Sequence, residues 1–188
     1  MRRVVVTEFV SADGVIEDPG GAEGFRHGGW TFKFNDDEGM KYKLDETLGH
    51  DALLLGRVTY EGFAKAWPGM TDEVGFADKM NNMPKYVVSS TLTEATWNNS
   101  TILRGDLAEE VGALKAQEGG DILVAGSASL VRGLTDLGLV DEYRLMMFPI
   151  ALGEGKRLFD GIGDSATLRL ADAKPLQSGT VILTYHRA

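Results

Sequence analysis

Short apolar runs recur along the chain and are separated by turn signals. The first run, Val4–Val10, is rich in β-branched and aromatic side chains, which is typical of a buried strand. Brief runs of the same kind predict further strands at residues 51–55, 86–89, 101–103, 122–125, 143–150, 167–173 and 180–186. The last three of these are longer than the others and are joined by glycine-rich turns.

Stretches between the early strands have the spacing of amphipathic helices. They predict helices over about 36–48, 59–67, 71–83, 107–117 and 126–137. Asn35 or Asp36 can cap the first helix, whose first turn is acidic, as the helix dipole favours. The glycine-rich residues 20–35 carry three aromatic side chains that look exposed, so we expect a loop that can cover a ligand; the aromatic residues are Phe25, Trp30 and Phe32.

The order of the predicted elements changes at Asp141. Strands alternate with helices before this residue, and the chain is β-rich after it. Alternation is typical of parallel strands, whereas strands that follow one another through short turns are antiparallel. The pattern therefore predicts an α/β fold, a mostly parallel sheet with antiparallel C-terminal strands, in a single domain over residues 1–188.

Composition and charge narrow the range of partners. The chain has 188 residues, 43% of them hydrophobic, and a formal net charge of −9. That charge repels phosphate backbones, so we expect no nucleic-acid partner, although a local basic site can bind a small phosphorylated ligand. We also expect a cytoplasmic protein with no membrane contact, because the start of the chain reads as a strand rather than a signal peptide and no apolar run approaches the length of a membrane helix.

Cysteine is absent, which excludes disulfides, thiolate nucleophiles and zinc–thiolate sites. The histidines, His27, His50 and His186, are scattered without the spacing of metal ligands. We therefore expect no metal site.

Three junctions at the ends of predicted strands carry residue types suited to phosphate binding: LLLGRVTYE (53–61), VVSSTL (87–92) and ILVAGSASLVRGL (122–134). Ligands of open α/β sheets bind at the carboxyl ends of strands, where helix N-termini present free N–H groups. In the first junction Gly56 permits close approach and Arg57 offers a bidentate fork, while a tight turn with a surface arginine is the simpler explanation. The serines of the second junction also suit an ordinary turn, and the small residues of the third also suit close packing of helix on strand.

Two other segments are weaker candidates for ligand binding. Residues 153–159, GEGKRLF, can hold a substrate phosphate through Lys156 or Arg157, or can form a plain hairpin connection. Trp30, with Phe32 and Phe34, can wall a substrate site or simply pack the loop onto the core.

These junctions, together with SADGVI (11–16) and LVDEYRLMMFPIALGEGKRLF (139–159), resemble in order and spacing the dihydrofolate-reductase-like superfamily. The branch it resembles more closely is that of the C-terminal reductase domain of RibD, the bifunctional riboflavin-biosynthesis protein. The resemblance covers nearly the whole chain. It implies a dihydrofolate-reductase-like central sheet of about eight strands with flanking helices, and an NADPH molecule lying across the carboxyl ends of the strands.

Carried over position by position, the resemblance implies roles for individual residues. Gly56, Arg57 and Thr59 would meet the phosphates of the cofactor, and the helix start would wrap its pyrophosphate through Gly126, Ser127, Ala128, Ser129 and Leu130. The adenosine 2′-phosphate would lie near Ser89, Ser90 and Arg104. The nicotinamide would lie near Ala12 and near Val15 or Ile16, and Asp13 would face the substrate.

One departure from the family pattern concerns the substrate. Dihydrofolate reductases carry a pterin-binding carboxylate on the helix before the G-R-x-T turn, and counting back from Gly56 lands on Met40. Glu38 is two residues away, a shift that turns a helix by roughly 200°. Dihydrofolate is therefore not the expected substrate. Riboflavin synthesis is not supported either, because the deaminase half of the bifunctional protein needs cysteine ligands for zinc.

The resulting hypothesis is an oxidoreductase that moves hydride from NADPH to a small heterocyclic or carbonyl-bearing substrate of pteridine or pyrimidine type. A proton donor is needed, and Asp13 is the first candidate, followed by Glu38 and Tyr60, although a structural Asp-Gly turn also explains Asp13. Two alternatives are a non-catalytic NADP(H)-binding module or regulator and a flavin-binding reductase. Apolar strands within residues 141–187 predict a homodimer with this part in the interface.

Overall fold

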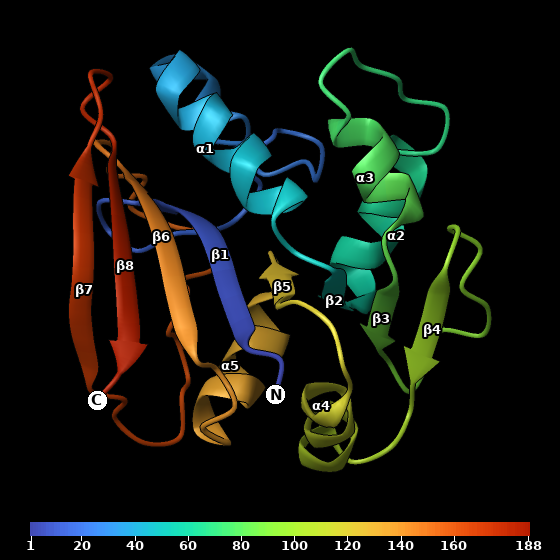
Figure 1. Cartoon of the computed structure of the whole chain (residues 1–188). Helices are drawn as coiled ribbons and strands as arrows, with labels where there is room; N and C mark the ends of the chain where they lie inside the picture. Colours follow the sequence, from blue (N-terminus) through green and yellow to red (C-terminus); the bar gives the residue numbers. More distant parts are fainter.

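The computed structural model describes all 188 residues, and they build one eight-stranded sheet flanked by five α-helices (Figure 1). The strands lie in the order β4-β3-β2-β5-β1-β6-β8-β7. The first six in this order are mutually parallel, and β8 and β7 extend the sheet in antiparallel register. The strands are β1 (Val4–Ser11), β2 (Ala52–Gly56), β3 (Lys85–Val88), β4 (Ser100–Leu103), β5 (Ile122–Ala125), β6 (Glu142–Phe148), β7 (Leu168–Pro175) and β8 (Val181–Arg187). The predicted mixed sheet and its strands are confirmed.

Three helices cover one face of the sheet and two cover the other. Core residues of α2 and α3 pack with alternate residues of β1, β2 and β5, and those of α4 and α5 pack with the residues between. The first helix lies on the same side as α3 (Figure 1). The helices are α1 (Asp37–Leu48), α2 (Arg57–Ala66), α3 (Phe76–Asn82), α4 (Leu107–Ala116) and α5 (Ala128–Asp136), and a short 3₁₀ helix, η1, spans Trp30–Phe34. None of these helices has the length and apolar character needed to cross a membrane.

Helix boundaries follow the capping residues. The Asp36 carboxylate accepts hydrogen bonds from the backbone N–H groups of Glu38 and Gly39, as the predicted cap requires. The helix predicted over 71–83 begins only at Phe76, because Gly75 before it is left-handed and the Asp72 carboxylate accepts hydrogen bonds from the N–H groups of Val74, Phe76 and Ala77. The helix predicted from Gly126 begins at Ala128, since Gly126 and Ser127 both adopt positive φ.

Candidate functional site

The first and third predicted junctions meet at the carboxyl edge of the sheet, because β2 and β5 are neighbours. The Ser127 hydroxyl accepts a hydrogen bond from the Gly56 backbone N–H at 2.9 Å and donates one to Thr59 Oγ1 at 2.9 Å. The start of α2 and the start of α5 are thereby joined. Three residues expected to bind the cofactor phosphates thus form one connected unit.

Close packing at this point leaves no room for larger residues. A Cβ atom at Gly126 would lie 3.1 Å from Thr59 Oγ1, and one at Gly56 would lie 3.3 Å from Ser127. Gly126 has φ +60°, and Ser127 adopts the left-handed conformation with φ 67° although it is not glycine. A non-glycine residue in this conformation costs of order 1–3 kcal/mol and is found most often at functional sites.

Helices α2 and α5 also differ from the other three at their N-termini. The first N–H groups of α1, α3 and α4 are bound by Asp36, Asp72 and Asp106 respectively. No side chain caps the first N–H groups of α2 or α5. These two helices therefore present unbound donors and the positive ends of their dipoles at the same edge, the arrangement that favours a phosphate ligand.

Arg57, the first residue of α2, lies on the surface. Its guanidinium forms an ion pair with Glu61 at 3.0 Å along the same helix, and both side chains are about two-fifths exposed. An exposed pair of this spacing contributes only about 0.3–0.5 kcal/mol, so a phosphate group can displace Glu61.

The second junction is ordered by its own turn. The Ser89 hydroxyl accepts hydrogen bonds from the N–H groups of Thr91 and Leu92. Arg104, which follows β4, donates to the carbonyl oxygens of Ser90 and Leu92. The structure thus brings together the three residues expected near the 2′-phosphate, with one cation on an exposed turn.

The Asp13 carboxylate is held by three hydrogen-bond donors. Its carboxylate accepts hydrogen bonds from Ser11 Oγ at 2.6 Å and from the N–H groups of Leu152 and Gly153 at 3.1 and 2.8 Å. The bond from Ser11 and those from the two backbone groups lower the pKa of Asp13 to about 2. A carboxylate that is ionised and held by these donors favours the Asp-Gly turn interpretation over the role of proton donor.

The remaining residues of the first loop lie where the chain returns from β6. The N–H of Ala12 donates to the Ile150 carbonyl, and that of Ile16 donates to the Lys156 carbonyl. Ala12 is exposed, and Ile16 is buried. The Lys156 ammonium is two-thirds exposed and pairs with Glu17 at 3.2 Å, so it lies beside this loop and is accessible to a ligand.

Three side chains named for the substrate side have internal partners, and one of them, Trp30, differs from the expected exposure. Trp30 is fully buried rather than exposed: its indole N–H donates to the Glu17 carbonyl and its ring packs edge-on against Phe148. The Glu38 carboxylate points to β7, where it pairs with Lys174 at 2.8 Å. The Tyr60 hydroxyl is buried and accepts the N–H of Trp97. Each of these side chains is occupied by packing or by an internal partner.

Sequence reasoning missed Glu8. This residue lies in the middle of β1, is 5% exposed, and has one carboxylate oxygen, Oε1, without any hydrogen-bond partner. Burial raises the pKa of Glu8 to about 8, although Lys43 and the backbone N–H of Gly126 act in the opposite direction. The signal was a single acid within the apolar run VVVTEFVS.

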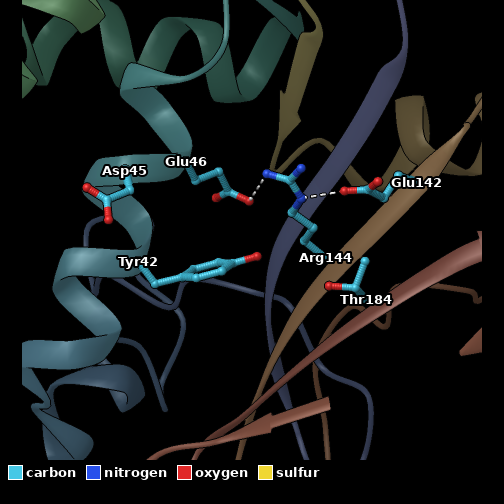
Figure 2. A pocket seen from close by; sticks show the side chains of 6 residues that line it. All are labelled: Tyr42, Asp45, Glu46, Glu142, Arg144 and Thr184. Atoms are coloured by element: carbon cyan, nitrogen blue, oxygen red, sulfur yellow. Dashed lines mark hydrogen bonds and ion pairs between the residues drawn. The ribbon is translucent and has the colours of Figure 1, made fainter. Parts of the chain in front are cut away.

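A polar cavity lies away from this edge, between α1 and the amino-terminal half of β6 (Figure 2). Arg144 extends between Glu46 of α1 and Glu142 at the start of β6. Tyr42, Asp45 and Thr184 complete the lining. None of the residues expected to bind the cofactor contributes to it.

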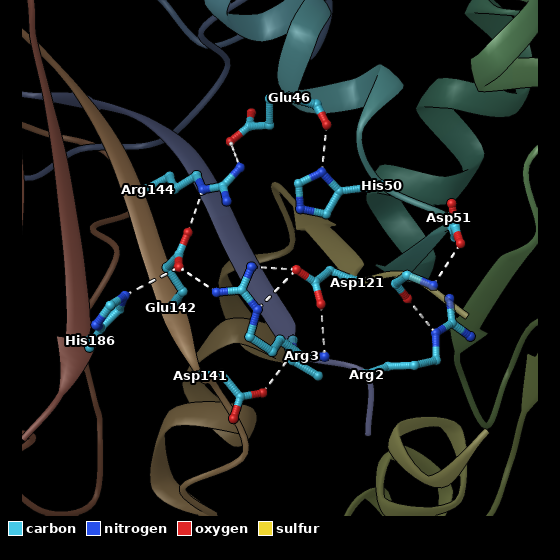
Figure 3. A network of polar contacts seen from close by, with 12 residues as sticks. Arg2, Arg3, Glu46, His50, Asp51, Asp121, Asp141, Glu142, Arg144 and His186 are labelled. Atoms are coloured by element: carbon cyan, nitrogen blue, oxygen red, sulfur yellow. Dashed lines mark hydrogen bonds and ion pairs between the residues drawn. The ribbon is translucent and has the colours of Figure 1, made fainter. Parts of the chain in front are cut away.

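The ion pairs of this cavity continue along the amino edge of the sheet (Figure 3). Arg3, the residue before β1, forms ion pairs with Asp121 and Glu142. His186 of β8 lies 3.2 Å from Glu142. Burial acts to raise the pKa of Glu142, but the ion pairs with Arg144 and Arg3 outweigh it and lower the pKa. We assign this network to holding β1, β5, β6 and β8 together, at the edge opposite to the candidate site.

Comparison with known proteins identifies the family of the chain. The family model described as RibD C-terminal domain matches residues 2–183. An uncharacterised protein of Bacillus subtilis strain 168, YyaP, is 32% identical over 188 residues, which cover 98% of this chain and 95% of YyaP.

Solved structures share the fold at lower identity. A putative riboflavin biosynthesis protein from Shewanella sp. PV-4 superposes with a TM-score of 0.75 at 22% identity, covering 99% of both chains. Dihydrofolate reductase from Enterococcus faecalis, solved in complex with NADP(H) and RAB-propyl, gives a TM-score of 0.60 at 18% identity, covering 98% of this chain and 96% of the enzyme. The fold is therefore dihydrofolate-reductase-like, as expected.

Proposed function

Because the chain belongs to the RibD C-terminal domain family, we propose that it is an NADPH-dependent reductase that works as one domain over residues 1–188. The substrate we propose is a small heterocycle of pteridine or pyrimidine type. Two proteins of the same fold, a putative riboflavin biosynthesis protein and a dihydrofolate reductase, support this class.

The observation that carries the proposal is the pair of uncapped helix starts joined by Ser127. Helices α2 and α5 leave their first N–H groups unbound at one edge of the sheet, while an aspartate side chain binds the first N–H groups of each of the other three. A dinucleotide has a pyrophosphate that these donors suit, and Arg57 and Arg104 add charge for a further phosphate. The donor set thus fits NADPH.

Each group at the edge then has a definite task. The N–H groups of α5 and the Gly56–Thr59 turn bind the phosphates, and the Ala12–Ile16 loop fixes the end of β1 where the reacting ring would lie. NADPH supplies the hydride when it is bound. Positioning of the two reactants accounts for much of the rate enhancement expected of such a site.

Binding and turnover can be tested separately. NADPH and NADH are titrated into the protein by calorimetry, and NADPH oxidation is followed by loss of its near-ultraviolet absorbance with pteridine and pyrimidine substrates. We expect saturable binding with preference for NADPH, and turnover with at least one substrate of these classes.

The outcomes separate the alternatives. Tight NADPH binding without turnover on any of these substrates would support a non-catalytic NADP(H)-binding module instead. A flavin retained by the purified protein, visible as yellow colour, would support a flavin-binding reductase. Failure to bind either nicotinamide cofactor would contradict the proposal.

A further inference from the structure

Glu8 is a buried acid beside the proposed pyrophosphate turn. It lies on β1 next to Leu145 of β6, one position beyond the pair Thr7 and Ala125, so it faces the end of β5. Its carboxylate points to the backbone N–H of Gly126, and its Oε1 atom has no partner. The side chain thus ends at the turn that joins β5 to α5.

The surroundings of Glu8 offer almost nothing to balance a negative charge. Residues 122–131, which form β5, the turn and the first half of α5, contain no titratable side chain. Two cations on the adjoining elements are bound elsewhere: Arg132 of α5 donates to the Asp160 carbonyl, and Arg144 of β6 pairs with Glu142 and Glu46. Lys43 of α1 is the one charge that acts on Glu8, and its ammonium is itself bound to Glu46 at 2.6 Å.

A purely structural explanation does not account for this residue. A buried acceptor without a partner destabilises the folded state, and an apolar residue would fill the same place in the strand without that loss. Ser127, immediately after Gly126, adds the strain of a left-handed conformation at the same point. Two unfavourable features therefore converge on one turn.

We propose that Glu8 belongs to the ligand site, where its buried carboxyl group forms a hydrogen bond with the bound dinucleotide at the Gly126–Ser127 turn. The inference rests on the proposed function, since NADPH is the ligand considered. It makes Glu8 a binding residue whose contribution to NADPH affinity depends on whether its carboxyl group is protonated.

The protonated form suits an anionic ligand. Burial keeps the proton on Glu8 up to about pH 8, so the group is neutral at physiological pH. A neutral carboxyl can donate to an oxygen of the dinucleotide, whereas the ionised form would place a second negative charge beside the phosphates. Binding and protonation should therefore favour each other.

Calorimetry measures this coupling directly. NADPH is titrated into the full chain at pH 8.5 in two buffers of different ionisation enthalpy, because at this pH the 2′-phosphate is already fully ionised. We expect the wild type to take up roughly half a proton or more per NADPH bound, and its Kd to rise by about tenfold per pH unit above about pH 8.

Two variants complete the experiment. In Glu8→Gln, proton uptake should vanish and the Kd should be independent of pH between 7 and 9.5. Glu109→Gln, which changes an exposed glutamate of α4, should behave as the wild type. Because a buried substitution can impair folding, the wild-type carboxyl is also followed by ¹³C NMR: we expect one glutamate signal that titrates near pH 8, and near a higher pH with NADPH bound.

The results discriminate between failures. NADPH that binds without proton uptake, or with equal uptake in Glu8→Gln, overturns the role of Glu8 and leaves the proposed function intact. A glutamate signal whose titration midpoint does not change when NADPH binds also overturns the role of Glu8. Absence of NADPH binding to the wild type overturns both.

Discussion

The Ser127 hydroxyl lies 2.9 Å from Thr59 Oγ1, across a separation of 68 residues in the chain. Each of the two segments alone is explained by an ordinary turn or by close packing. Their direct contact shows that both turns open onto the same point of the sheet edge. An anion bound by one helix start is therefore within the electrostatic reach of the other.

Gly126→Ala should disrupt this arrangement. The new Cβ would lie 3.1 Å from Thr59 Oγ1 in a backbone with φ +60°, so we expect a loss of about 1–2 kcal/mol in the free energy of unfolding and at least a tenfold weaker NADPH affinity. Gly112→Ala on α4, where a Cβ meets nothing within 4 Å, is the matched control and should be neutral or slightly stabilising. Urea denaturation and NADPH titration measure both effects. Equal NADPH affinity in the two variants would contradict the prediction.

Arg57→Ala should lower the affinity for NADPH by roughly ten- to a hundredfold, because one charge-assisted hydrogen bond contributes about 1.5–3 kcal/mol. NADH should be affected much less if Arg57 meets the 2′-phosphate. Glu61→Gln removes the competing partner at 3.0 Å, so NADPH affinity should stay the same or rise. Titrations of wild type and both variants with each cofactor make the comparison. If Arg57→Ala binds both cofactors as tightly as the wild type, Arg57 has no role beyond its ion pair with Glu61.

The strand and helix pattern was predictable because each element carries its own local signal. The structure has strands at the apolar runs, a helix capped by Asp36, and only strands as regular elements after Asp141. Parallel order followed from the alternation of strands and helices, as it does in most α/β folds.

The state of individual side chains was not predictable, because it depends on distant partners. Asp13 is held by backbone groups of residues 152 and 153, which no local pattern connects to it. Trp30 looked exposed in a glycine-rich loop but packs under it against Phe148. Strand β1 is buried on both faces, so alternation could not show which way Glu8 points.

Dihydrofolate should be a poor substrate. The α1 position that would need a carboxylate holds Met40, whose side chain is 68% exposed, and the nearby Glu38 is paired with Lys174. Loss of a positioned acid typically costs about 10²–10⁴-fold in rate. Steady-state assays with NADPH and dihydrofolate test this. Turnover at an ordinary rate of roughly 1–10³ per second would show that another residue supplies the acid.

The C-terminal edge of the sheet should mediate homodimerisation. Strand β7 is an edge strand with most of its residues exposed, and Leu170 on it is 51% exposed. Light scattering at micromolar concentration should give twice the chain mass of 20.4 kDa. Leu170→Lys should shift the protein toward the monomer, whereas Leu137→Lys, equally exposed on the end of α5, should not. A monomeric wild type would refute the predicted dimer.

Glu8 should make the stability of the ligand-free protein depend on pH. Its pKa is raised from 4.5 to about 8 by burial, so between these values the folded state keeps a proton that the unfolded state has released. Stability must then fall as pH rises through this window, by up to about 1.4 kcal/mol per pH unit and by about 5 kcal/mol in all. Other groups such as His50, whose pKa burial lowers, act in the opposite direction over part of the range. The informative quantity is therefore the difference in unfolding free energy between wild type and Glu8→Gln, measured by urea denaturation at several pH values. That difference should move steadily in favour of Glu8→Gln from pH 5 to pH 8, because glutamine has no proton to lose. A difference that stays constant over this range would mean that Glu8 is ionised in the folded protein, with a counter-charge that its surroundings in β1, β5 and α5 do not provide.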